Sequence, residues 1–225
     1  MRHSILFVTG TDTGAGKTVL TCLLTRHLRG RGLRVAALKP ICSGGRDDAL
    51  RLQRALGGAL ELDEINPWHF RAPLAPLLAA RREQRRVRLP QVIERIRTIQ
   101  ARFDIVLVEG AGGLFSPLGE GFDSYDLIAA VRATPIVVCP NRLGAVNHAL
   151  LTIEALPRTT ANGACLVLSD PREPDAASRT NPGLLRELRP GLKCFRLPWL
   201  GRRQISGRVS KSDAFARFAR DLIGN

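Results

Sequence analysis

Residues 4–18 of the chain read SILFVTGTDTGAGKT. A short apolar segment is followed there by a loop with three glycines, and the loop ends in Lys17 and Thr18. Glycine permits the backbone dihedrals that point several consecutive N–H groups at one oxyanion. A helix that begins near Lys17 adds free N-terminal donors and the positive end of its dipole. The pattern predicts a nucleotide phosphate site, in which Lys17 reaches the terminal phosphates and the Thr18 hydroxyl binds magnesium.

The glycine loop departs from the most common spacing of such sites. The common pattern has four residues between its first glycine and the Gly-Lys pair, whereas Gly10 and Gly16 enclose five, with Thr11 at the usual glycine position. The apolar segment before the loop and the helical spacing after it supply the strand and the helix that a phosphate loop requires. We interpret residues 10–18 as a variant phosphate loop.

A second lysine follows the apolar segment Leu33–Leu38, where Lys39-Pro40 ends the run and Ser43 lies close behind. Ligands in open parallel α/β sheets bind beyond the carboxyl ends of the strands. The chain has only four lysines among its 34 basic residues, so a retained lysine suggests a need for a compact point charge. We favour a functional cation at Lys39 over a solvated strand end.

A carboxylate ends another apolar segment, Ile105–Val108, and Gly-Ala-Gly-Gly follows it. The charge of Glu109 needs a partner at the end of a buried strand, and magnesium is a suitable one. We favour this reading over a solvated strand end. Asp47 or Asp48, in GRDDALRLQRALG, is interpreted from the residues alone as a helix cap.

A helix start near Ala145 is a further candidate site. The chain turns there through Leu143-Gly144, and Asn147 and His148 fall in the first helical turn. Free amides at a helix start can hold a carboxylate. A lone histidine beside such a start is more often structural than catalytic, so His148 alone indicates no catalysis.

Short apolar segments alternate with segments of helical spacing along the whole chain. The segment Leu33–Leu38 has no strong alternation, which is typical of a parallel sheet covered on both faces. Strands are expected at 5–8, 33–38, 105–108, 134–139, 163–168 and 192–197, and helices at 19–31, 46–57, 89–103, 145–156, 182–188 and 212–223. Proline and tryptophan predict a loop at 66–76. The order predicts an α/β protein.

The length of 225 residues is sufficient for one buried core, and we expect a single domain over residues 1–225. The first apolar run, Ile5–Val8, is too short for a signal peptide or a membrane span, so we expect a cytoplasmic protein with no membrane partner. The five cysteines are odd in number and far apart, which favours buried reduced thiols over disulfides or a zinc site.

The formal net charge of +14 raises the possibility of a nucleic-acid partner. Almost all of this charge is arginine spread along the chain, as a general preference for arginine over lysine would produce. The densest run, Arg81–Arg88, is interpreted as a solvated helix end and turn. We expect no nucleic-acid partner.

Six short motifs together resemble those of the dethiobiotin synthetases of biotin synthesis. They are GTDTGAGKT at 10–18, LKP at 38–40 with Ser43, DAL at 48–50, NPWHF at 66–70, VEGAGG at 108–113 and LGAVNHALLT at 143–152. The likeness runs from about residue 4 to residue 155 and then weakens, up to Pro198-Trp199-Leu200. The five-residue spacing of the phosphate loop is itself characteristic of that family.

The resemblance implies a three-layer fold like that of P-loop NTPases, with helices on both sides of a mostly parallel central sheet. It implies ATP as co-substrate, Mg²⁺ as cofactor and a homodimer. The implied reaction joins 7,8-diaminononanoate, a diamino acid, with CO₂ as a carbamate, whose oxygen takes the γ-phosphoryl group of ATP. The neighbouring amine then closes the ureido ring, and phosphate leaves.

The resemblance also implies roles for individual residues. Lys17 would neutralise phosphate oxygens, Lys39 would pair with the carbamate, and Thr13 would donate a hydrogen bond, which makes these three the catalytic set. The implied magnesium ligands are Thr18, Asp48 and Glu109. The implied nucleotide-binding residues are Asp12, Thr13, Gly14, Ala15, Gly16, Lys17, Thr18, Glu109 and Ser169. The implied substrate-binding residues are Ser43, Gly112 and, from the other subunit, Gly144, Ala145, Val146 and Asn147.

Three positions depart from the family pattern. Gly14 stands where the family usually has an acidic residue. Ser169 precedes Asp170 where the family commonly has Asn-Asp, and that asparagine contacts the base, so the resemblance does not fix the nucleotide preference. Residues 170–182 give no clear match to the substrate-facing part of the second subunit.

Two other functions compete with this one. The departures leave room for a related P-loop ligase that forms an amide or carbamate on another substrate. A partition-type ATPase that binds DNA or membrane is the third reading. Those ATPases carry a signature lysine where this chain has Asp12, and the basic amphipathic helix of their membrane-binding forms contrasts with the mixed charges of residues 212–225.

Overall fold

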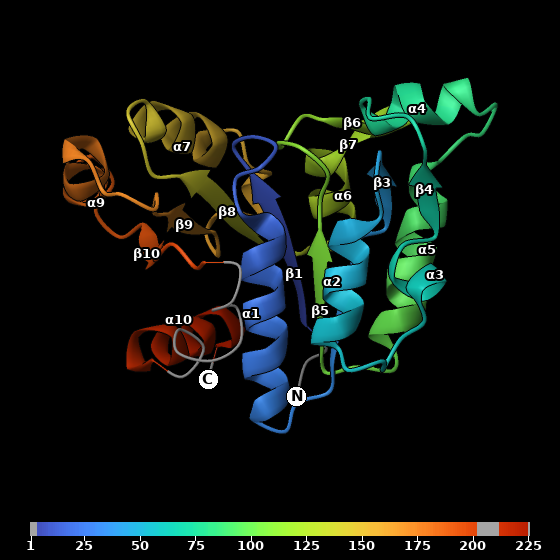
Figure 1. Ribbon diagram of the computed structural model, residues 1–225, viewed down its shortest axis with the longest axis horizontal. Coiled ribbons are helices and arrows are strands. Elements are labelled where there is room, and N and C mark those ends of the chain that lie inside the picture. Colours follow the sequence, from blue (N-terminus) through green and yellow to red (C-terminus); the bar gives the residue numbers. More distant parts are fainter. Residues whose placement is uncertain (1–3, 202–211, 225) are drawn as a thin grey trace.

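A sheet of six parallel strands, in the order β10-β9-β8-β1-β5-β2, lies at the centre of the molecule. The computed structural model describes residues 4–201 and 212–224 (Figure 1). The six strands are β1 (Ser4–Gly10), β2 (Val35–Leu38), β5 (Ile105–Glu109), β8 (Thr134–Pro140), β9 (Cys165–Ser169) and β10 (Lys193–Leu197). The predicted α/β class with a mostly parallel sheet is confirmed.

The middle strands are apolar because both of their faces are covered. All five residues of β5 are buried, and β1 pairs with β5 on one side and β8 on the other. Because the strands run parallel, their carboxyl ends share one edge of the sheet, where Gly10, Leu38 and Glu109 end three adjacent strands. Polar side chains that follow these strands are therefore brought close together.

Helices cover both faces of the sheet and complete three layers (Figure 1). On one face, α1 (Lys17–Gly30) packs between α2 (Asp47–Ala55) and α10 (Asp213–Ile223). The other face carries α5 (Leu89–Gln100), α6 (Ser124–Val131) and α8 (Arg158–Ala161). Towards the β10 edge, α7 (Ala145–Glu154) and α9 (Ala176–Leu188) contact each other.

Two small strand pairs extend the structure beyond the carboxyl edge of the sheet. The parallel pair is β3 (Ile41–Ser43) with β4 (Trp68–Phe70), and the antiparallel pair is β6 (Pro117–Gly119) with β7 (Phe122–Asp123). Two short helices accompany them, α3 (Leu62–Ile65) and α4 (Pro76–Arg82). Strands of two or three residues are too short to show a periodicity, so the sequence gives no sign of them.

The loop predicted at residues 66–76 is wrong in part, because it contains β4 and the first residue of α4. Asn66 anchors this segment, since its Nδ2 donates to the Lys39 carbonyl at 2.7 Å. The Trp68 N–H then donates to the Pro40 carbonyl at 3.1 Å. These long-range bonds hold the chain as a strand. The helix end and turn predicted at Arg81–Arg88 are confirmed, since α4 ends at Arg82.

The start of α2 differs from the predicted cap. The helix begins at Asp47 with Arg46 at the N-cap position, and no side chain caps it. Both aspartates therefore lie inside the first turn, where their negative charge interacts favourably with the positive end of the helix dipole. Asp48 is engaged elsewhere, because its Oδ2 lies 3.0 Å from the Lys39 ammonium.

Helix α9 begins six residues earlier than the predicted start at Pro182, because Ala176 opens it and Pro182 lies inside it. Asp175 is the N-cap of this helix, because its Oδ1 accepts a hydrogen bond from the Ser178 N–H at 2.7 Å. The N-cap marks the true start of the helix, which the proline within it makes hard to recognise in the sequence. A proline lacks the N–H of a helix interior, which is why the sequence favours a start there.

The buried apolar side chains of the sheet and of both helical layers form one cluster, with Phe7 and Phe215 among its largest fully buried members. The prediction of a single domain over residues 1–225 remains a prediction. All five cysteines are free, and four of them are buried. Within residues 4–201 and 212–224, no helix is both long enough and apolar enough to cross a membrane.

Candidate active site

A cleft of about 700 Å³ opens at the carboxyl ends of β1, β5 and β2. The phosphate loop and the first turn of α1 form one wall, and α2 contributes Asp48 and Arg51. Lys39 and Glu109 reach it from the ends of β2 and β5, and residues 73–76 at the start of α4 also line it. The structure thus brings together residues from distant parts of the sequence.

The loop between β1 and α1 has the conformation that its glycines permit. Gly14 and Gly16 have φ angles of +73° and +102°, in the left-handed region that favours glycine. Gly16 is the N-cap of α1, so no side chain caps the first-turn N–H groups. These donors and the helix dipole can accept a phosphate. The Lys17 ammonium lies over the same loop and donates to the Asp12 carbonyl at 2.9 Å.

Lys39 forms a buried ion pair with Glu109. Its Nζ lies 2.7 Å from Glu109 Oε1 and 3.0 Å from Asp48 Oδ2. Burial alone would lower the pKa of Lys39, but the charges and hydrogen bonds of the two carboxylates outweigh it and raise the pKa. Burial would likewise raise the pKa of Asp48, and Lys39 lowers it instead. Lys39 is thus a fixed cation at neutral pH.

The oxygen atoms of Thr18, Asp48 and Glu109 fit a magnesium site. The Thr18 hydroxyl donates to Glu109 Oε1 at 2.7 Å, and Glu109 Oε2 is buried without a hydrogen-bond partner among the described residues. A buried carboxylate oxygen without a partner is costly unless a cation or water meets it. Magnesium takes one or two carboxylates and completes its shell with phosphate oxygens and water.

This donor set is small. Within the described residues, no group of three or more histidine, cysteine, aspartate or glutamate side chains could hold a metal ion. Two carboxylates and one hydroxyl match the sparse protein shell of a magnesium ion that is shared with a nucleotide. The chemistry of the residues is therefore compatible with magnesium at this place.

Lys17 is buried, and this burial lowers its pKa to about 8, with the positive charge of Lys39 as the next cause. The carboxylates of Glu109 and Asp48 oppose the shift. An oxyanion placed beside the ammonium would favour its charged form. The site therefore contains a lysine whose protonation depends on whether an anion is bound.

The predicted substrate residues Ser43 and Gly112 also line the cleft. The Ser43 hydroxyl donates to the Leu74 carbonyl. Gly112 has a φ of +71°, and a Cβ there would lie 2.2 Å from Ser116 Oγ. Only glycine fits this turn, which keeps backbone close to the cleft.

Other predicted site residues lie outside the cleft. Residues 144–147 start α7 and do not line it. Ser169 ends β9 behind the phosphate loop, where its Oγ lies 3.1 Å from the position of a Cβ on Gly16. The Asp12 side chain is exposed, and its Oδ1 accepts the Thr13 N–H at 2.6 Å. Of the loop residues, those from Thr13 to Thr18 line the cleft.

Several cleft residues have no role in the sequence motifs, among them Cys42, Arg51 and Ser116. Arg51 follows Asp48 by three residues on α2, so both side chains belong to one helix face. That spacing is the signal that could have indicated Arg51. Arginine is so frequent in this chain that residue type alone carries little information.

Comparison with solved structures confirms the fold. A ParA family ATPase from Chlorobium tepidum TLS matches with a TM-score of 0.60 at 12% identity, covering 99% of each chain. The signal recognition particle receptor FtsY from Elizabethkingia anophelis matches with a TM-score of 0.54 at 12% identity, covering 99% of this chain and 64% of that one. At this identity the likeness concerns the three-layer fold alone.

Sequence comparison is more specific. A family model described as an AAA domain matches residues 4–209. The ATP-dependent dethiobiotin synthetase of Anaeromyxobacter dehalogenans is 48% identical over 168 residues, which cover 73% of this chain and 75% of the relative. That of Methanocaldococcus jannaschii is 39% identical over 68% of this chain and 73% of the relative. Identity of this level over most of both chains shows that the chain belongs to the dethiobiotin synthetase family.

Proposed function

We propose that this protein forms dethiobiotin from 7,8-diaminononanoate, CO₂ and ATP, with release of ADP and phosphate, in the cleft beside the phosphate loop. The observation that carries the proposal is the position of Lys39, a fixed cation 2.7 Å from Glu109 and 3.0 Å from Asp48 in the same cleft as Lys17. A nucleotide triphosphate and a second anion can meet there. Family membership supports the same activity.

The proposed sequence has three steps. One amine of the substrate adds to CO₂ and loses a proton, which gives a carbamate. A carbamate oxygen then attacks the γ-phosphorus of ATP, the bond to ADP breaks, and a carbamic-phosphoric anhydride forms. The neighbouring amine attacks the carbonyl carbon, loses a proton and displaces phosphate. Because a carbamate is a weak nucleophile, holding it in line with the γ-phosphoryl group is the main task of the protein.

The charged residues of the cleft share this task. Lys17 and the N–H groups at the start of α1 bind the β- and γ-phosphates, and Thr13 donates a further hydrogen bond. Lys39 stays protonated, so it neutralises the carbamate and the transferring phosphoryl group rather than moving a proton. Ser43 and Gly112 line the same cleft, where they would contact the substrate.

The proposed magnesium ligands are Thr18, Asp48 and Glu109, for which the unpartnered Glu109 Oε2 is the supporting observation. When bound with ATP, magnesium compensates charge on the phosphoryl group during transfer. Asp48 and Glu109 also hold Lys39, so the same carboxylates set the position of the cation and of the metal.

We also propose a homodimer. Residues 144–147 lie at a helix start and do not line the cleft of their own chain. Nearby apolar side chains are exposed, with Phe115 at 61%, Leu143 at 86% and Leu151 at 62%. A second subunit that covers them would bring its α7 start to the cleft, where free amides would bind the substrate carboxylate. Light scattering should give twice the mass of one chain.

The activity is tested by measuring phosphate release from Mg-ATP and dethiobiotin by mass spectrometry. We expect release to require both diaminononanoate and bicarbonate, and the product to appear in equal amount. Release at the same rate without the diamine, with acceleration by DNA or lipid vesicles, would contradict the proposal and favour a partition-type ATPase. A panel of other diamines and amino acids tests for a related ligase with a different substrate.

Cytoplasmic location and the lack of a nucleic-acid partner remain predictions. Nucleotide preference is part of the same test, because Ser169 departs from the family pattern at the position that contacts the base. Turnover should be measured with ATP, GTP and CTP at equal concentrations, and we expect ATP to be used.

A further inference from the structure

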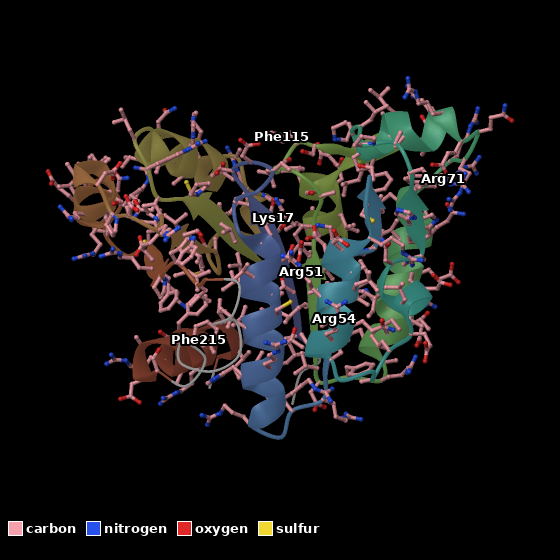
Figure 2. All side chains as sticks on the ribbon, viewed as in Figure 1. Lys17, Arg51, Arg54, Arg71, Phe115 and Phe215 are labelled. Carbon is pink, nitrogen blue, oxygen red and sulfur yellow. The ribbon has the colours of Figure 1, made fainter. Side chains whose placement is uncertain are left out.

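Arg51 is a cation in the cleft to which the sequence motifs give no role. It lies on α2, three residues after Asp48, and it lines the same cleft as Lys17 and Lys39. Figure 2 places it between α1 and α2, below Lys17 in that view, whereas Arg54 lies one turn further along α2. Arg54 does not line the cleft, so the two arginines of one helix have different surroundings.

The other charges of the cleft leave Arg51 without a close partner. Among the described residues no carboxylate lies within ion-pair distance of its guanidinium, and its side chain makes no hydrogen bond. The two cleft carboxylates, Asp48 and Glu109, are both bound to Lys39. The charge of Arg51 does act on Asp48, where it adds to the stronger effect of Lys39 in lowering the pKa. Arg51 is therefore close to the candidate metal ligands and free to bind an anion.

The charge of the cleft suits a magnesium-bound triphosphate only when Arg51 is included. Lys17, Lys39 and Arg51 face two carboxylates, which leaves one net positive charge on a site that must receive about two negative charges of Mg-ATP. Lys17 covers the loop side, under the β- and γ-phosphates. Arg51 comes from α2, on the side of Asp48, where the end of the triphosphate would lie beside its metal.

We propose that Arg51 binds the γ-phosphate of Mg-ATP. A guanidinium presents a planar fork that matches two phosphate oxygens. Neighbouring positions at this spacing on a helix are about 5–6 Å apart, so Arg51 reaches over the same ligand as Asp48. This role rests on the proposed function, because it presumes that ATP occupies the cleft.

The test compares ATP with ADP, since only ATP carries the γ-phosphate. Dissociation constants of Mg-ATP and Mg-ADP are measured by calorimetry without the diamine, for the wild type, Arg51→Ala, Arg51→Lys and the control Arg54→Ala. We expect Arg51→Ala to raise the dissociation constant of Mg-ATP about 10-fold and that of Mg-ADP by less than about 2-fold. Arg51→Lys should recover part of the loss, and Arg54→Ala should change neither constant.

Equal weakening of ATP and ADP by Arg51→Ala would overturn the inference, because it would place the arginine elsewhere on the nucleotide or in the fold. No change in either constant would also overturn it, and would assign Arg51 to the solvated surface. The two proposals fail separately. A wild-type protein that binds ATP but makes no dethiobiotin contradicts the proposed function, whereas the ratio of the two constants tests Arg51 alone.

Discussion

The Lys39 ammonium lies 2.7 Å from Glu109 Oε1, and both side chains are almost fully buried. This pair joins the ends of β2 and β5, the strands that form the floor of the cleft. Neither charge has ready access to water, so each depends on the other. The pair therefore affects both the stability of the protein and the chemistry of its cleft.

Lys39→Met should lower the free energy of unfolding by about 3–5 kcal/mol, because it leaves the Glu109 carboxylate buried without its cation. Urea unfolding at pH 7 measures this change. The exposed Lys193 is the matched control, and we expect Lys193→Met to change stability by less than about 0.5 kcal/mol. The double variant Lys39→Met/Glu109→Gln should recover much of the loss. A double variant as unstable as the sum of the two single ones would show that the residues do not act as a pair.

Lys39→Ala tests the chemical role of the same residue. We expect turnover to fall by about 10²- to 10³-fold, while the dissociation constant of Mg-ATP changes little, because Lys39 is assigned to charge that develops during transfer. Single-turnover kinetics and calorimetry give the two values. A large loss of ATP binding with unchanged turnover would place Lys39 on the nucleotide instead. Because the substitution also costs stability, the assay must be run where the variant is shown to be folded.

The central sheet and much of the cleft can be predicted from the sequence, and the reason is physical. Parallel strands buried on both faces need continuous apolar segments, and a charge such as Glu109 at the end of one is conspicuous. Lys39 is conspicuous in a chain rich in arginine. The carboxyl ends of parallel strands share an edge, so these two residues must lie near the phosphate loop.

The remaining features depend on long-range contacts that no local pattern encodes. Pairing of β3 with β4 rests on the Asn66 side chain and the backbone of residues 39–40. The preference of Asp48 for Lys39 over a cap position appears only when β2 and α2 are placed together. No local pattern indicates Arg51, because its proposed role depends on which face of α2 meets the cleft.

Asp48 and Asp47 are adjacent in the sequence but differ in the structure, which makes them a matched pair. Asp48 lines the cleft and contacts Lys39, whereas Asp47 is exposed. We expect Asp48→Asn to raise the magnesium concentration needed for half-maximal turnover by about 10-fold or more, since it weakens one metal ligand. Asp47→Asn should leave that concentration unchanged. Equal behaviour of the two variants would exclude Asp48 as a ligand.

Lys17 should make ATP binding depend on pH. Its pKa is lowered to about 8, first by burial and then by the charge of Lys39, so in the free protein it loses its proton as the pH rises through about 8. In the unfolded chain it keeps the proton up to its ordinary value of 10.5. Between these values the unfolded state binds more protons, so Lys17 makes stability rise with pH there.

Bound phosphates favour the charged form of Lys17, so ATP binding should take up a proton at pH 9 and almost none at pH 6.5. Calorimetry in two buffers of different ionisation enthalpy measures this uptake. ATP affinity should fall as the pH rises above about 8. Lys17→Arg keeps a permanent charge at this position, so the uptake at pH 9 should disappear in that variant even where ATP still binds. Equal uptake in the variant and the wild type would assign the proton to another group.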